Sequence, residues 1–455
     1  MTTQLDYDSI LRTALSHGGE LADLYIEEQQ FTTILLEDGV IERVLTGSDR
    51  GAGLRVIASH HTFYGATNDI TEPSLLTLAR TLSRAVPVLH AHSISGSTPP
   101  PPLEHRSPIP LSRLTTLLPE IDRAVRSIDP RIRQLQLVVR DSAFLVRYAS
   151  SEGVHRTWLK GGCVFSAQVT AADAGVIQTG YEAVGGSLGF DLLEGDKPLD
   201  AATRAARRAL LSLSAPRIRG GVMPVVLSSE AGGTMVHEAI GHGLEGDLVN
   251  QGMSVYRGKV GHQVASPLVS IVDDPTIPGA RGSYPFDDEG TPAQRTLLVE
   301  RGVLQGFLRD RLTALKEGGN STGNGRRESY QSRPIVRMSN TLILPGEDDP
   351  SDIVGSVSQG LFVRKMGGGQ VNTVTGDFVF EVSEGYLIER GEITRAVRGA
   401  TLTGNGPDVL KRISRVGNDL GFGIGTCGKD GQGVPVADAQ PTLLIDGMTV
   451  GGEAG

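Results

Sequence analysis

The sequence predicts an α+β fold in two parts, and three patterns support this prediction. Before about residue 215, segments with helical spacing of apolar residues are interspersed with segments of alternating apolar and polar residues. Beyond about residue 260, short apolar segments lie between turns rich in glycine and proline. The segment 216–221 separates the two regions. We therefore expect an N-terminal α+β domain over residues 1–215, which combines helices with a β-meander, and a β-rich C-terminal domain over residues 216–455 that carries one helix with potential metal ligands.

The first elements are a helix and a meander. Apolar residues between Ile10 and Leu15 recur at helical spacing, Asp6 or Asp8 can cap this helix, and glycines at 18–19 end it. Alternating segments follow, with a turn at 37–39, and they predict an antiparallel meander. These segments are 24–26, 33–36, 40–45 and 54–58.

The rest of the N-terminal part alternates between helices and strands. Helical spacing predicts helices over 71–86, 111–128 and 199–213, and alternation predicts strands over 132–149 and 154–170. Residues 87–110 are rich in proline, serine and histidine, which is typical of an extended loop.

The C-terminal part begins with a strand at 223–227, and a helix rich in glycine and alanine is expected over 229–244. Short strands are then predicted between turns. They cover residues 268–272, 297–300, 342–344, 377–382 and 443–445.

Composition excludes several classes of protein. The chain has 455 residues, a net charge of −9 and a pI near 5.6, so it lacks the basic surface of a nucleic-acid-binding protein. Its local arginine groups, at 204–208 and 326–327, are diluted by acids and are expected to face solvent. No signal peptide or membrane-spanning run is visible. Two cysteines cannot form a disulfide framework, so a cytoplasmic location is expected.

The most informative motif is HEAIGH at residues 237–242, in which two histidines are five residues apart. On a regular α-helix, at about 100° per residue, their side chains point about 140° apart and cannot reach one ion. A π-bulge near 239–241 widens the turn to about 4.4 residues and brings the rings within about 50° of each other. Gly241 makes such a distortion inexpensive. We therefore predict a π-bulge here, and a regular helix would argue against one metal bound by both His237 and His242.

A catalytic zinc site needs a third protein ligand. The other candidates in the chain are His262, the acidic run 287–289 and Cys427, and a thiolate suits zinc well. Cys427 lies among glycines at 421–433, which together with those at 232–246 predict bent backbone around a metal. Glu238, beside a histidine, is suited to act as a general base.

Two segments of the sequence resemble the signatures of the TldD/PmbA metallopeptidases. They are HEAIGHGLEGD at 237–247 and GTCGKDGQGVPV at 425–436. Further segments at 284–292, at 337–341 and near the C-terminus are similar to other family segments. The resemblance is close over the C-terminal half and looser before it.

The resemblance implies a zinc-dependent peptidase of the active, TldD type, because the chain keeps the metal motif that the paralogous TldE or PmbA subunit lacks. It implies Zn²⁺ held by His237, His242 and Cys427, with Glu238 as the catalytic carboxylate. It also implies hydrolysis of unfolded or flexible peptides inside a dimer, formed with a second copy or with a TldE/PmbA-type paralogue. Direct binding to nucleic acid or membrane is not expected.

Alternatives remain at this point. The chain could instead be a non-catalytic, zinc-stabilised scaffold or partner subunit, or a zinc hydrolase of other amides, and Glu238 argues against the scaffold. The sequence names no donor for the oxyanion, and it leaves Asp287, Asp288 and Glu289 as either turn caps or positioning residues. Cys163 is expected in the core. The histidines at 60–61 and in the loop at 90, 92 and 105 are not expected to bind metal. Peptide backbone could pair with an exposed strand edge in the β-rich half.

Overall fold

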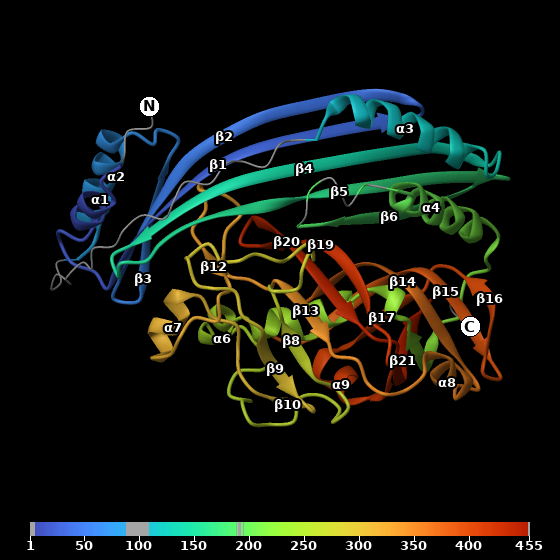
Figure 1. The fold of residues 1–455 in the computed structure, drawn as a ribbon. Coiled ribbons are helices and arrows are strands. Elements are labelled where there is room, and N and C mark those ends of the chain that lie inside the picture. The colour runs from blue at the N-terminus through green and yellow to red at the C-terminus, as the bar shows by residue number, and fades with distance from the viewer. Residues whose placement is uncertain (1–4, 88–108, 188, 190–192, 194, 454–455) are drawn as a thin grey trace.

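A six-stranded antiparallel sheet arches over the rest of the chain in the computed structural model, which describes residues 5–87, 109–187, 189, 193 and 195–453 (Figure 1). Its strand order is β3-β2-β1-β4-β5-β6. The N-terminal part consists of α1 (Tyr7–Ala14), β1 (Leu21–Glu37), β2 (Val40–Ala58), β3 (His61–Thr67), α2 (Glu72–Ala85), α3 (Leu111–Arg126), β4 (Ile132–Ser150), β5 (His155–Asp173), β6 (Val176–Gly186) and α4 (Lys197–Ser214).

The predicted meander is present, but its strands are much longer than the apolar segments indicated. β1 and β2 have 17 and 19 residues and pair along their whole length. They are joined by Asp38 and Gly39, both with positive φ, as in a type I′ hairpin turn. Continuous backbone pairing carries the sheet through polar stretches, such as the exposed first half of β2, where no apolar alternation marks a strand.

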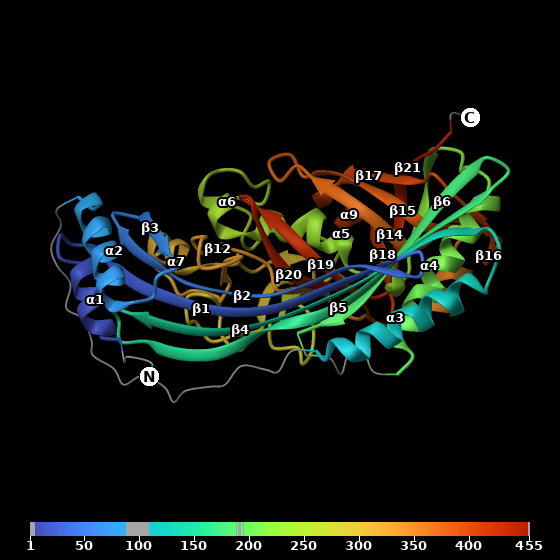
Figure 2. The ribbon, with the colours of Figure 1, turned by 90° about the horizontal axis from the view of Figure 1, so that it is seen from above.

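Helices cover the two ends of this sheet. At one end α1 and α2 pack on β1 and β2, and at the other α3 and α4 pack on β4 and β5 (Figures 1 and 2). The Asp6 carboxylate accepts a hydrogen bond from the Ser9 N–H, which confirms the predicted cap of the first helix. All four helices agree with their predicted positions to within three residues. The loop predicted over 87–110 lies largely outside the described residues.

Two sheets form most of the C-terminal part. One has the order β10-β9-β8-β13-β20-β19, and in the other β14, β7, β21, β17 and β15 pair in a closed ring, with β16 beside β15 and β18 beside β21. The elements are β7 (Gly221–Leu227), α6 (Gly246–Asn250), β8 (Ile271–Asp273), β9 (Thr296–Glu300), β10 (Val303–Leu304), α7 (Arg311–Glu317), β11 (Gly325–Arg326), β12 (Ile335–Val336), β13 (Asn340–Ile343), α8 (Pro350–Gly355), β14 (Gln359–Val371), β15 (Asp377–Glu389), β16 (Glu392–Val397), β17 (Thr401–Asn405), α9 (Gly406–Lys411), β18 (Ile413–Val416), β19 (Gly421–Lys429), β20 (Gln432–Gln440) and β21 (Leu443–Gly451).

The α+β class is therefore confirmed, whereas the expectation of only short strands beyond residue 260 is wrong for β14 and β15, which have 13 residues each.

The large apolar cores of the sheets lie on separate sides of residue 215, and a smaller cluster around Tyr25, Trp158 and Tyr330 joins the two parts. The division into domains at residues 1–215 and 216–455 remains a prediction. Within the described ranges, no helix is both long and apolar enough to cross a membrane.

Candidate metal centre

The two histidines of the HEAIGH motif flank a π-helical turn, His237–Gly241: His237 begins the turn and His242 directly follows it. The predicted long helix over 229–244, called here the site segment, is instead divided by Gly232, whose φ is +76°. It consists of 3₁₀ turns at Ser229–Ala231 and His242–Leu244, a short α-turn at Thr234–Val236, and the π-turn between them. The predicted π-bulge is thus confirmed.

Close packing explains the glycine in this turn. A Cβ atom at Gly241 would lie 2.2 Å from the Met338 sulfur, so a larger residue would force the two segments apart. The apolar residues of the turn lie in the core shared by the two C-terminal sheets. Packing on both sides therefore holds the π-turn in place.

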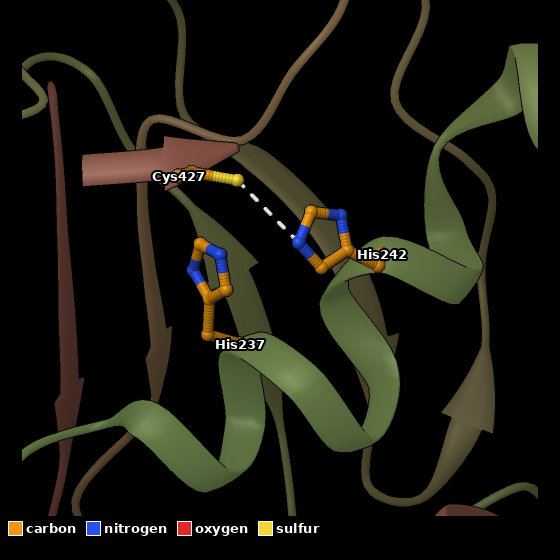
Figure 3. A group of neighbouring side chains, drawn as sticks. All are labelled: His237, His242 and Cys427. Carbon is orange, nitrogen blue, oxygen red and sulfur yellow. Dashed lines mark hydrogen bonds between the residues drawn. The ribbon is translucent and has the colours of Figure 1, made fainter. Parts of the chain in front are cut away.

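His237, His242 and Cys427 form one cluster (Figure 3). Their potential ligand atoms all lie within 4.8 Å of one another, and the Cys427 sulfur is 3.4 Å from Nε2 of His242. The two imidazole rings are nearly perpendicular, at 89°, with centroids 5.0 Å apart. Cys427 comes from β19, 185 residues away along the chain, so the fold brings together ligands from two distant segments.

The electrostatics of this cluster favour the thiolate form of Cys427. Burial alone would raise the pKa of the Cys427 thiol, but its contacts with His237 and His242 lower it to about 5. The thiolate is the form of cysteine that binds zinc. Nδ1 of His237 is buried and has no hydrogen-bond partner among the described residues. Two imidazoles, one of them with this unpartnered ring nitrogen, and a thiolate would supply the three protein ligands that a catalytic zinc ion needs.

Charged residues behind His242 support it, and sequence reasoning missed them. Glu245, fully buried, accepts a hydrogen bond from Nδ1 of His242 at 3.0 Å and forms an ion pair with Lys429 at 3.1 Å. Lys429 also pairs with Asp247 at 2.7 Å. Burial opposes ionisation of Glu245, but Lys429 and His242 lower its pKa to about 2. The bond to Nδ1 leaves Nε2 of His242 facing Cys427, as in carboxylate–histidine–zinc arrangements. The spacing of Glu245 three residues after His242 could have indicated this role.

Glu238 lines the same cavity as the three candidate ligands. The cavity has a volume of about 1610 Å³, and β6, α4, β14, β19 and the site segment form its walls. Burial is the main cause that raises the pKa of Glu238 above its usual range, while the two histidines lower it. A carboxylate with a raised pKa beside a metal cluster is suited to take up and release a proton.

β19 lies at the edge of its sheet and borders this cavity along its whole length. Asp430 and Gly431 join β19 to β20 in a two-residue turn with positive φ at both positions, so Lys429 and Gln432 form a hydrogen-bonded pair. By alternation, the backbone groups of Phe422, Ile424, Thr426 and Gly428 face away from β20. The unpaired Pro435, opposite Thr426, agrees with this register.

The glycines of this strand serve close packing instead of a bend. The prediction of bent backbone over 421–433 is wrong, because β19 is a regular strand up to its turn. A Cβ atom at Gly421 would lie 2.2 Å from the Ser229 carbonyl oxygen, and one at Gly423 would lie 2.7 Å from the Asp438 carboxylate. The absence of side chains lets the site segment approach β19 closely.

The remaining ligand candidates lie elsewhere. His262 is exposed on a loop, and His60 and His61 are exposed near the start of β3. Cys163 lies in the N-terminal core, as expected. None of these is among the cavity-lining residues. The histidines at 90, 92 and 105 lie outside the described residues.

The acidic run 287–289 lies between the two parts of the chain. Asp287 caps a turn by accepting hydrogen bonds from the Glu289, Thr291 and Gly325 N–H groups. Asp288 pairs with Lys160 at 2.8 Å, and Glu289 with Arg55 at 2.6 Å. Both residues thereby tie the C-terminal part to the N-terminal sheet, and neither lines the cavity.

The expectation that the arginine groups face solvent is wrong for three of their members. Arg204 and Arg207 are exposed, but Arg208, Arg326 and Arg327 are buried. Arg208 pairs with Glu182 and Glu384, Arg327 donates to the Asp288 carbonyl, and Arg326 donates to the Met338 and Pro435 carbonyls. The acidic and carbonyl partners come from distant segments, which the sequence alone does not reveal.

Comparisons with known proteins define the class. Models of three consecutive parts of PmbA/TldA metallopeptidases match this chain: domain 1 over residues 22–86, the central domain over 104–213 and the C-terminal domain over 220–452. Together they place the chain in a class of metallopeptidases. The chain belongs to the PmbA/TldD family.

Individual relatives agree with this assignment. The "Metalloprotease TldD homolog" of Haemophilus influenzae is 39% identical, over 96% of this chain and 94% of its own. The "Zinc metalloprotease TldD homolog" of Saccharolobus solfataricus is 28% identical, over 74% of this chain and 75% of its own. A crystal structure from Thermotoga maritima has a TM-score of 0.78 at 22% identity, covering 98% of this chain and 99% of its own. TldE from Thermococcus kodakarensis has a TM-score of 0.74 at 18% identity, with the same coverage.

Proposed function

We propose that this protein is a zinc-dependent peptidase that hydrolyses unfolded or flexible peptides, with Zn²⁺ held by His237, His242 and Cys427. The observation that carries the proposal is the cluster itself: two imidazoles, brought together by a π-turn, meet a cysteine with a lowered pKa in a large cavity. Bound zinc would lower the pKa of a water molecule to about 7 and polarise the carbonyl of the scissile bond. The name of the Saccharolobus relative, a zinc metalloprotease, supports this choice of metal.

Glu238 supplies the proton transfers in this mechanism. Its carboxylate accepts a proton from the attacking water and then donates it to the amine that leaves. Its raised pKa favours this exchange, because the group can hold a proton between the two steps. Glu245 and Lys429 hold His242 in orientation throughout. The geometry singles out no donor for the oxyanion.

The edge of β19 offers a way to bind peptides of varied sequence. An extended peptide can pair with the outward backbone groups of Phe422, Ile424, Thr426 and Gly428 and thereby pass Cys427. Strand pairing needs an extended backbone with unpaired groups, which a folded protein does not offer. Because the pairing makes little use of side chains, a flexible segment of almost any sequence could bind. We infer that unfolded or flexible peptides are the substrates on this basis.

The substitution Glu238→Gln tests the proposal. We expect zinc content to stay the same and peptide hydrolysis to fall by about 10²–10⁴-fold, because the carboxylate is needed for proton transfer and not for binding the metal. The measurements are metal analysis of the purified protein and turnover of an unstructured peptide with a fluorophore–quencher pair. Glu230→Gln is a matched control, since Glu230 lines the same cavity and should be dispensable. Unchanged hydrolysis in Glu238→Gln would show that this residue is not the general base, and zinc-loaded wild-type protein without hydrolysis would favour a scaffold subunit.

We further propose that the protein works as a dimer, either with a second copy or with a TldE/PmbA-type paralogue. The fold shared with TldE of Thermococcus kodakarensis supports a partner of that shape. Molar mass measured with and without a TldE-type subunit distinguishes the two assemblies. Cytoplasmic location stays a prediction from the cysteine content.

A further inference from the structure

A second pocket adjoins the cavity beside β19. Its volume is about 460 Å³, and it lies between the N-terminal sheet and the middle of β19. Five residues line both spaces: Tyr181, Ala183, Ile424, Gly425 and Thr426. A ligand bound along β19 therefore borders this pocket as well as the metal centre.

Two arginines from different parts of the chain converge in this pocket. Arg281, partly buried, donates a hydrogen bond from Nε to the Gly425 carbonyl at 3.2 Å, and Arg140 enters from β4. Neither forms an ion pair with an acid among the residues that the structure describes. The lining that the structure describes holds these two arginines and one carboxylate, that of Asp141, so its formal charge is positive.

Among the described residues, Arg281 has other cations nearby and no ion-paired acid. Burial is the main cause that lowers its pKa, and the nearby Arg326 and Arg140 lower it further. Arg326 is itself buried and bound to two backbone carbonyls. A guanidinium that lacks an acidic partner in such a place is poised to bind a carboxylate, which it matches with two parallel hydrogen bonds.

The position of Arg281 relates this pocket to the proposed reaction. Gly425 precedes Cys427 by two residues on β19, which corresponds to about 7 Å along a strand. A peptide paired with β19 and cleaved near Cys427 would thus present a group about two residues from the scissile bond to Arg281 and Arg140.

We propose that Arg281 and Arg140 form a subsite that binds a substrate carboxylate about two residues from the scissile bond. This inference rests on the proposed peptidase function and adds a preference to it. The carboxylate can be the side chain of Asp or Glu, or the free C-terminus of the peptide. In the second case the enzyme would release short C-terminal fragments.

Matched peptides test the subsite and separate the two sources of carboxylate. One set replaces Gln by Glu at each position within three residues of the cleavage site, and another compares a C-terminal acid with the corresponding amide. Binding is measured on zinc-loaded Glu238→Gln protein, so that it does not depend on turnover, and hydrolysis is measured on the wild type. We expect one of the two carboxylates to lower Kd about tenfold. This preference should disappear in Arg281→Gln and Arg140→Gln and persist in Arg133→Gln, an exposed arginine on β4 outside the pocket.

Each outcome decides the matter. Equal binding of acidic and neutral peptides overturns the subsite, even where hydrolysis confirms the peptidase. A preference that survives both pocket substitutions overturns it too. If the wild type hydrolyses no peptide, the proposed function fails, and the Kd values still report on the subsite. Arg140 is exposed, so Arg140→Gln remains informative if Arg281→Gln does not fold.

Discussion

At the scale of single residues, the candidate centre depends on groups that do not touch the metal position. Glu245 is fully buried between His242 and Lys429, and its only role visible in the structure is to hold these two residues. Lys429 follows Cys427 by two residues on β19, so the same carboxylate links both segments that bear candidate ligands. Removing the charge on Glu245 should therefore loosen the site without removing a ligand.

We predict that Glu245→Gln lowers zinc affinity by about 10–100-fold, the usual effect of losing the carboxylate partner of a metal-bound histidine. Competition with a chromogenic chelator measures this affinity directly. Hydrolysis should recover at high zinc concentration, which separates a positioning role from a catalytic one. Glu317→Gln, which removes a carboxylate paired with Arg309 far from the centre in sequence, is the control. Wild-type affinity in Glu245→Gln would contradict the role assigned to this residue.

At the scale of elements, the sequence predicted the centre better than the strand that completes it. The five-residue spacing of His237 and His242 predicted a π-turn, because an unbroken α-helix cannot bring the two rings together. For β19 the prediction of bent backbone was wrong, because local propensity alone takes its glycines as a sign of flexibility, whereas they lie in a regular strand. Their actual role, contact with the site segment, depends on a pairing across about 190 residues of sequence, and local patterns carry no information about such pairings.

The packing of β19 leads to a prediction with a control on the same strand. Gly421→Ala should lower the free energy of unfolding by about 1–3 kcal/mol, because the new Cβ would overlap the backbone of Ser229 and backbone cannot move aside as a side chain can. Gly428→Ala should change it by less than about 0.5 kcal/mol, since a Cβ there meets open space. Denaturant unfolding monitored by circular dichroism measures both values. Equal stabilities would mean that the glycines of β19 are not selected by close packing.

At the scale of the whole molecule, buried ion pairs connect the N-terminal sheet with the part that carries the metal centre. Arg55 lies between Asp23 on β1 and Glu289 beyond β8, and all three side chains are at most 1% exposed. The sequence showed Glu289 only as part of an acidic run, because its partner lies 234 residues away. These contacts fix the sheet above β19, and the second pocket exists only in that arrangement.

Replacing Arg55 with Met should lower the free energy of unfolding by about 3–5 kcal/mol. Met fills much of the same space but leaves Asp23 and Glu289 buried without their cation, and an uncompensated buried charge costs far more than the loss of an exposed ion pair. Arg131→Met, which removes a surface ion pair with Asp129, is the matched control and should have a much smaller effect. Adding Asp23→Asn and Glu289→Gln to Arg55→Met should restore part of the loss, because no buried charge then lacks a partner. Denaturant unfolding of the four proteins measures these differences, and a loss in Arg55→Met no greater than in the control would show that the ion pair contributes little to joining the two parts.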